Sequence, residues 1–471
     1  MVAVICLFLP AFAMNLLRGK LIVPNRGMKR EILEYLMSVL MVNYAMMSVL
    51  TVFGEHKENI VAQMNQYLVF SWKYLSCALI ISVAEVFLEK FVRQKLEISV
   101  TFCNLRLRFK YWKAAIWVYS FMLFCLNAIR VFDHNFWGDE AYSVIISRRN
   151  LLDLLEITAQ SDSHPPLYYL ICKFVCDIAG TSGIVYHLIS MIPYVIILIL
   201  SLTVVCKWFG FHATLILVTL ASLLPNAVTY NVEVRMYSWG EMFIFLSFLA
   251  LYKILKEGTW KDYVLFIVAT LAAAYTHYYC LVAVAILYLI LLCDAIVYKT
   301  KKKIIYIAVT YLCAVVGYLP WLGFLIMGIQ RHINGFWATE IPSVKTCMDY
   351  IFNTKYGYIL LFLLFFTAAA AILYESGILH TEKAKKIKIS FHLKKACITV
   401  KCQWIISGFI CMFGTMMVGM VVSVLFRPLL VLRYIYPVLI IAWLILGVCI
   451  SSLKWKSVYT AFVVILMVFS A

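Results

Sequence analysis

Charged residues are scarce in this chain of 471 residues, where they make up 14% against 64% hydrophobic residues. Soluble domains contain about 25% charged and 45–50% apolar residues. The composition therefore excludes a soluble globular protein, a disordered chain and a collagen-like chain. Acidic residues are the scarcer kind, because 23 Asp and Glu stand against 41 Lys and Arg, which gives a net charge of +18. In a membrane protein such an excess marks the cytoplasmic loops, so nucleic acid is not needed to explain it.

Cysteine patterns typical of metal or disulfide sites are also absent. The chain has 15 cysteines but no CxxC pair. Most of them lie inside apolar runs, where cysteine packs as a small hydrophobe. The spacing therefore indicates neither a disulfide framework nor a cysteine-based zinc site.

Long apolar runs, by contrast, are abundant. A helix needs about 20 mostly apolar residues to cross a bilayer, and about fourteen runs qualify or nearly do. The sequence therefore predicts an all-α integral membrane protein, a polytopic helical bundle with about 14 spans. The first run has no basic residues before it and no small-residue cleavage site, so no signal peptide is expected. The runs are 1–17, 33–53, 67–88, 114–132, 183–206, 211–228, 239–255, 262–278, 279–298, 304–323, 356–375, 403–426, 433–452 and 457–471.

The orientation of the bundle depends on one shorter segment, 166–180. If this segment lies along the membrane surface, the lysine-rich and arginine-rich segments all fall on one side; if it spans, they divide between two sides. The positive-inside rule favours the surface interpretation, which makes that side cytoplasmic. The basic segments concerned are 89–113, 253–261, 299–303, 376–402 and 454–456.

The same orientation places two long segments, 133–165 and 324–355, on the extracytoplasmic side. Within the first, residues 140–158 carry apolar residues at helical spacing, which predicts one amphipathic helix on the membrane surface. Residues 1–113, with three spans and a basic linker, are predicted to form a separate N-terminal module of unknown function. Residues 114–471 form the main membrane domain.

Two acidic motifs occur in the first outer segment. Asp139 and Glu140 stand side by side just beyond the span 114–132, where one carboxylate can act as a general base. The alternative is that Asp139 caps the surface helix. Asp162 and His164 precede two prolines that fix a stiff turn, so both side chains can face a phosphate or a metal.

Further motifs follow the later spans at the same side. Glu233 and Tyr237, four residues apart, are expected to share a helix face. Arg235 between them suits a lipid phosphate, although it can also be a snorkelling arginine. His277 ends the span 262–278, where an interfacial histidine is the plainer interpretation. Arg433 follows an outer turn, so it is a basic residue on the side that otherwise has few basic residues.

Taken in order, these motifs resemble the membrane GT-C glycosyltransferases, in the branch of the protein O-mannosyltransferases and the lipid A aminoarabinose transferases. In that family an acid pair follows the first conserved span and a Pro-Pro motif opens a juxtamembrane helix. Glu-x-Arg-x-Tyr, Thr-His-Tyr and Arg-Tyr motifs come later. The resemblance covers about residues 114–440 and leaves 1–100 unexplained. The matching residues are Asp139-Glu140, His164-Pro165-Pro166, Glu233, Arg235, Tyr237, Thr276-His277-Tyr278, Arg433-Tyr434 and Pro437.

The resemblance implies a GT-C bundle with interfacial helices on the outer face of a cell membrane, and a bacterial origin is expected. It implies transfer of a sugar from a polyprenyl-phosphate donor to an acceptor hydroxyl, with membrane lipids around the protein and a glycan, lipid or protein as acceptor. Asp139 is the expected base, assisted by Glu140, and one base with direct displacement implies inversion at the anomeric carbon. The expected ligands of the donor phosphate are His164, Arg235 and Arg433, supported by Asp162, Glu233, Tyr237 and Tyr434.

Three points stay open in the sequence. A cofactor is not established, although Asp162, Glu233 and His277 are candidate ligands of a divalent ion such as Mg, Mn or Zn. A transporter or flippase of lipid-linked glycans is the alternative class, but its ionisable groups would be expected near the bilayer midplane. A polysaccharide polymerase or ligase would place key residues in a large outer loop, and the segment 324–355 is expected to recognise the acceptor.

Overall fold

The computed structural model describes residues 105–132, 135–297, 300–353, 357–383, 387–391 and 399–453. Ten of the predicted spans lie in this part of the chain, and each of them forms a helix. The predicted spans 1–17, 33–53, 67–88 and 457–471, and most of the N-terminal module, lie outside the described residues.

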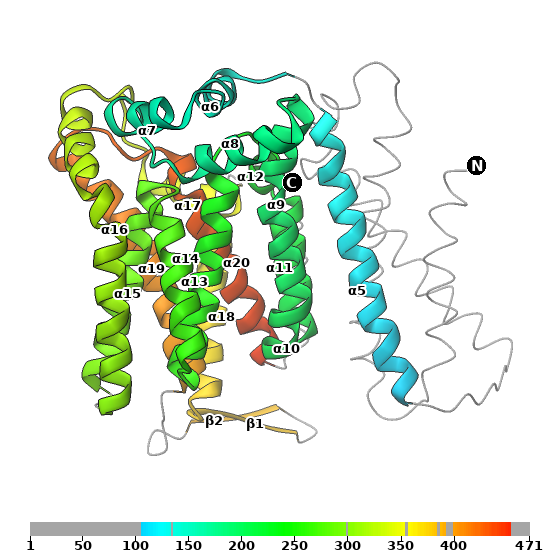
Figure 1. The fold of residues 1–471 in the computed structure, drawn as a ribbon. Helices are drawn as coiled ribbons and strands as arrows, with labels where there is room; N and C mark the ends of the chain where they lie inside the picture. Colours follow the sequence, from blue (N-terminus) through cyan, green and yellow to red (C-terminus); the bar gives the residue numbers. More distant parts are fainter. Residues whose placement is uncertain are drawn as a thin grey trace, which may run out of the picture.

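The long helices run back and forth between two ends of a bundle (Figure 1). Within the described residues, seven of them are long and apolar enough to cross a membrane, and the stretches Ile116–Phe132 and Phe211–Leu223 are shorter and apolar. The prediction of a multi-pass helical membrane protein is thus confirmed. The long helices are α5 (Leu105–Ala128), α9 (Gly183–Leu200), α11 (Phe211–Leu223), α13 (Tyr237–Lys256), α14 (Trp260–Ala274), α15 (Tyr278–Val297), α16 (Lys301–Gly335), α18 (Gly357–Glu375), α19 (Val400–Leu425) and α20 (Leu432–Leu453).

Short elements close the two ends of the bundle (Figure 1). One end, called here the motif end, carries the 3₁₀ helix η1 (Ile129–Phe132), α6 (Gly138–Ser147), α7 (Leu151–Gln160), α8 (Leu167–Ala179), α12 (Pro225–Tyr230) and α17 (Val344–Phe352). The opposite end, called the lysine end, carries the π-helical turn Ser201–Val205, α10 (Cys206–Phe209) and an antiparallel hairpin of β1 (Leu379–Lys383) and β2 (Ile387–Phe391). Lys253, Lys256, Lys301–Lys303 and Lys401 lie at the ends of the helices there.

The segment 166–180 forms the helix α8, which lies at the motif end and does not cross the bundle (Figure 1). It has 13 residues and packs against α6 and α9. The helix thus has the place that the surface interpretation predicts, and the long helices alternate in direction so that Lys253, Lys256, Lys301–Lys303 and Lys401 lie at one end.

The predicted surface helix over 140–158 is wrong in one respect, because the structure has two helices there. The helix α6 ends at Ser147 and α7 begins at Leu151. Asn150 causes the new start, since its side-chain oxygen accepts a hydrogen bond from the Asp153 N–H at 2.8 Å and so caps α7. The break lets the two helices point in different directions over the motif end.

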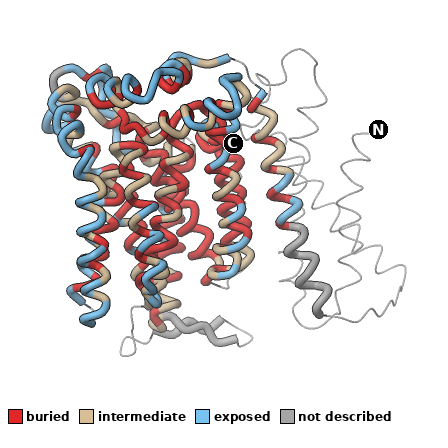
Figure 2. The backbone as a smooth tube through the Cα atoms, in the orientation of Figure 1, coloured by how far each residue is buried: buried red, intermediate tan, exposed pale blue. Residues whose placement is uncertain are grey.

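The centre of the bundle is α20, and α16 lies at its edge. In α20, 94% of the most apolar stretch is buried within the protein, against 11% in α16, and Figure 2 shows this contrast. Gly447 permits the close packing of α20 on α11, because a Cβ atom there would stand 2.7 Å from the Ala213 carbonyl oxygen. Helix α20 therefore fixes the frame from which Arg433 and Tyr434 project.

Candidate active site

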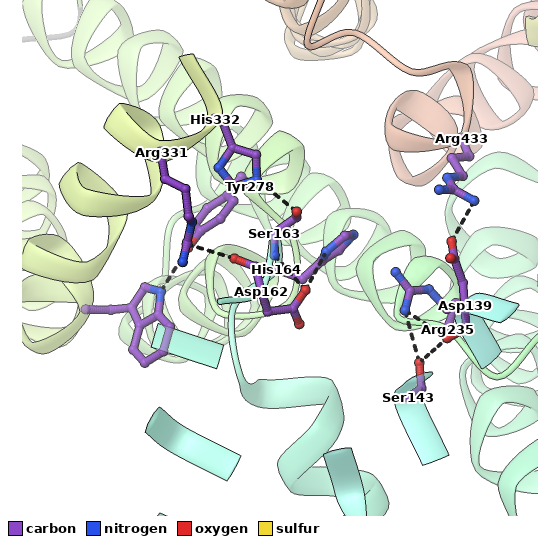
Figure 3. A network of polar contacts seen from close by, with 11 residues as sticks. Asp139, Ser143, Asp162, Ser163, His164, Arg235, Tyr278, Arg331, His332 and Arg433 are labelled. Carbon is purple, nitrogen blue, oxygen red and sulfur yellow. Dashed lines mark hydrogen bonds and ion pairs between the residues drawn. The ribbon is translucent and has the colours of Figure 1, made fainter. Parts of the chain in front are cut away.

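The structure brings residues from all five sequence motifs together at the motif end. The acid pair lies in the first turn of α6, the Asp162–His164 turn precedes α8, and Glu233 and Arg235 lie between α12 and α13. His277 lies at the junction of α14 and α15, and Arg433 opens α20. Figure 3 shows the resulting polar network.

Asp139 forms an ion pair with Arg433. Its Oδ2 lies 2.8 Å from Arg433 Nη1, and the two side chains are 34% and 20% exposed. The guanidinium carbon of Arg433 also lies 5.5 Å from the ring centres of both Trp137 and Trp337. Two aromatic faces thus hold a cation next to the expected base.

Arg235 supports the same turn of α6 from inside the protein. Its side chain is 3% exposed, and its Nη1 donates to the Asp139 carbonyl oxygen and to Ser143 Oγ, both at 3.1 Å. Ser143 Oγ in turn donates to the same carbonyl oxygen at 3.1 Å. Two guanidinium groups therefore flank Asp139, one at its side chain and one at its backbone (Figure 3).

Glu140 is buried, and both of its carboxylate oxygens accept backbone hydrogen bonds. The Trp137 N–H donates to Oε2 at 3.2 Å, and the Val234 N–H donates to Oε1 at 2.8 Å. These bonds tie the start of α6 to the segment that carries Glu233 and Arg235. Glu140 thus anchors the backbone on which Asp139 stands.

Glu233 and Tyr237 do not share a helix face, contrary to the sequence prediction. The helix α13 begins at Tyr237, and residues 231–236 form turns. In this segment, backbone groups that would form hydrogen bonds within a helix contact side chains instead. His187 Nδ1 lies 2.8 Å from the Val232 carbonyl oxygen, and the Val234 N–H donates to Glu140.

The carboxyl group of Glu233 lies in a largely buried environment. Its Oε1 accepts from Trp137 Nε1 at 2.9 Å, whereas its Oε2 is buried without a hydrogen-bond partner. Burial and then the charge of Glu140 raise the pKa of Glu233 to about 7. Near neutral pH this carboxyl group is therefore only partly ionised.

His164 packs in an aromatic cluster with His277 and Tyr434. Its ring centre lies 5.0 Å from that of His277 and 5.7 Å from that of Tyr434. Its Nδ1 lies 3.5 Å from Asp162 Oδ1. Burial lowers the pKa of both His164 and His277. Both imidazoles are therefore neutral at pH 7.

Two residues of the segment 324–355 hold the Asp162–His164 turn. Both lie near the end of α16, where Arg331 Nη2 donates to the Asp162 carbonyl oxygen at 3.0 Å and His332 Nε2 lies 2.8 Å from Ser163 Oγ. They position this turn in the structure (Figure 3). No local pattern in the sequence predicts these contacts, because they join residues 169 positions apart.

The candidate metal ligands do not come together. Within the part of the chain that the structure describes, no three His, Cys, Asp or Glu side chains are grouped so that they can hold a metal ion. His277 Nδ1 accepts a hydrogen bond from the Tyr279 N–H at 3.1 Å, and Glu233 Oε1 accepts one from Trp137 Nε1. Asp162, Glu233 and His277 therefore do not form a common ligand set in this conformation.

In a comparison with protein families, residues 163–324 match the model described as dolichyl-phosphate-mannose-protein mannosyltransferase. This match covers about a third of the chain and confirms the resemblance to membrane glycosyltransferases drawn from the motifs. It includes His164, Glu233, Arg235 and His277, whereas Asp139 and Arg433 lie outside the matched residues. Neither a curated protein nor a solved structure matches the chain.

Proposed function

We propose that the protein transfers a sugar from a polyprenyl-phosphate donor to an acceptor hydroxyl, at the extracytoplasmic face of a cell membrane and with inversion at the anomeric carbon. The observation that supports this most directly is the position of Asp139 between the guanidinium groups of Arg433 and Arg235. A base and two cations thus lie together at one end of a membrane bundle, which is what attack on a sugar phosphate requires. The described lysines at the other end support the assignment of the motif end to the outside.

In the proposed reaction the acceptor hydroxyl oxygen attacks the anomeric carbon of the donor sugar. The bond between that carbon and the phosphate oxygen breaks, and polyprenyl phosphate leaves with the bonding electrons. Asp139 takes the proton of the hydroxyl. Arg433 and Arg235 stabilise the charge that develops on the phosphate. His164 is neutral, so its contribution is a hydrogen bond and not a charge.

The test uses the purified protein in nanodiscs with a pool of polyprenyl-phosphate sugars and a host membrane extract as acceptor. Mass spectrometry follows which donor disappears. We expect the wild type to consume one donor and Asp139→Asn to consume it about 10²–10⁴-fold more slowly, because a positioned base contributes that much. Asp153→Asn, a change at an exposed carboxylate on α7 at the same end, is the matched control and should keep the wild-type rate. Near-normal transfer by Asp139→Asn would refute the base assignment.

One observation favours the alternative of a lipid-linked glycan transporter. Glu241 is buried within α13, where its Oε2 accepts from Tyr436 OH at 2.9 Å. Ionisable groups inside membrane spans often mark transport pathways. In the same experiment, binding of donors without consumption by the wild type would support this alternative.

A further inference from the structure

We infer that the donor phosphate and the side chain of Asp139 compete for the guanidinium of Arg433, so that donor binding frees the carboxylate of Asp139. The inference rests on the proposed function and adds an order of events to it. The donor binds first, and both carboxylate oxygens of Asp139 are then available to the acceptor hydroxyl.

The ion pair itself is the first observation. At 2.8 Å, Arg433 Nη1 and Asp139 Oδ2 are in direct charge-assisted contact. A general base has to approach the hydroxyl oxygen to about 2.6–3.2 Å. While Oδ2 is held by Arg433 it is not available for that contact. The arrangement without donor is therefore a resting state of the base.

The surroundings of Arg433 restrict how an anion can reach it. The indole rings of Trp137 and Trp337 lie against the guanidinium, with its carbon 5.5 Å from each ring centre. The Nε atom is buried and has no hydrogen-bond partner. An incoming phosphate therefore has to meet the terminal nitrogens, and Asp139 already occupies one of them.

The backbone under Asp139 is fixed independently of Arg433. Arg235 Nη1 holds the Asp139 carbonyl oxygen, and Glu140 holds the N–H groups of Trp137 and Val234. The side chain of Asp139 can therefore turn away from Arg433 while α6 stays in place. Because the side chain is 34% exposed, no buried packing has to be broken.

The exchange is a replacement of one anion by another on the same cation. No covalent bond changes, and the charge of Arg433 stays neutralised throughout. Removal of the negative charge at position 139 should therefore strengthen the binding of a phosphate. If the guanidinium instead bridged Asp139 and the phosphate, removal of the negative charge at position 139 would weaken phosphate binding, because the carboxylate would then help to orient the guanidinium.

The test measures the affinity of a short-chain polyprenyl phosphate for the full protein in nanodiscs, by titration with native mass spectrometry. We expect Asp139→Asn to bind about two- to fivefold more tightly than the wild type, the range of a partly exposed charge pair. Arg433→Gln should bind more weakly than the wild type, and the double variant should match Arg433→Gln, since no competition remains. Asp153→Asn should bind like the wild type. Asp139→Ser serves as a second neutral variant if Asp139→Asn does not fold.

Equal or weaker binding by folded Asp139→Asn would overturn the competition. If the wild type nevertheless binds the phosphate and transfers a sugar, the proposed function stands and only this inference fails. Absence of binding by both wild type and Asp139→Asn would contradict the inference and the proposed function together. Thermal unfolding of each variant separates these outcomes from a folding defect.

Discussion

The two ends of the bundle both contain charged pairs, but they differ in how completely the pairs are satisfied. At the lysine end, Lys401 Nζ lies 2.7 Å from Glu375 Oε1 and 3.3 Å from Ser452 Oγ. Asp294 is bound there by both Lys303 and Gln403. Such closed networks satisfy their own charged groups and stabilise a fold.

The motif end, by contrast, gathers buried polar atoms that have no hydrogen-bond partner within the described part of the chain. At the lysine end Asp294 Oδ2 is also without a hydrogen bond, but it is ion-paired with Lys303. Buried polar atoms without a partner are costly and call for an explanation, and a polar substrate supplies one. Such atoms at the motif end include His164 Nε2, Glu233 Oε2, Arg235 Nε, Tyr237 OH and Arg433 Nε.

The largest effect that separates the two ends is expected for Arg235→Ala. Loss of a preorganised donor next to the reacting groups should slow sugar transfer about 10²–10³-fold. The measurement is the initial rate of donor consumption in nanodiscs, at equal amounts of folded protein. Lys401→Met removes a cation of the lysine end and should change the rate less than about twofold, because that pair is remote from the site. Similar losses in both variants would remove the distinction between the ends.

A second effect concerns the pH dependence of stability at the motif end. Because the pKa of Glu233 is raised to about 7 in the folded protein from 4.5, folding favours its protonated form. Its contribution to stability is full below about pH 4.5 and is lost as the pH rises through about 7, by an amount of order 3 kcal/mol. Glu233→Gln should therefore flatten the decline of the unfolding midpoint between pH 5 and 8. The same decline in Glu233→Gln and wild type would contradict the assignment.

The smallest effect is expected for the pair at the lysine end. A double-mutant cycle with Glu375→Gln and Lys401→Met should give a coupling of about 1 kcal/mol or less in the free energy of unfolding, since both side chains are partly exposed. Sugar transfer by all three variants should stay within about twofold of the wild type. A larger loss of sugar transfer in these variants would show that the lysine end affects the site and that the two ends of the bundle do not act independently.

Apolar length and charge placement account for most of the fold that could be predicted. The helices of the ten described runs follow from their apolar length, and the position of α8 follows from the placement of the lysines and arginines. The break between α6 and α7 was missed because apolar spacing continues through it, although Asn150 is a recognisable cap. The hairpin of β1 and β2 was missed because its lysines suggested a solvated loop, although Ile387–Phe391 alternates in the manner of a strand.

The candidate site could be predicted as a set of residues but not as a set of contacts. The family resemblance pointed to Asp139, His164, Arg235 and Arg433, which the structure brings to one end. The backbone contacts of Glu140 join α6 to a segment about 94 residues later, and sequence spacing carries no information on such pairs. Ser143 is the exception, because four residues after Asp139 it falls on the same helix face.

The length of α16 has a consequence for the lipids around the protein. The candidate span Lys301–His332 has 32 residues, with basic residues at both ends, and is about 48 Å long, whereas the hydrocarbon core of a bilayer measures about 30 Å. A helix of that length adapts to the membrane by tilting or kinking, and it contains Pro320. Because Arg331 and His332 near its end contact the turn of Asp162 and Ser163, we expect the acyl-chain length of the surrounding lipids to affect the position of that turn.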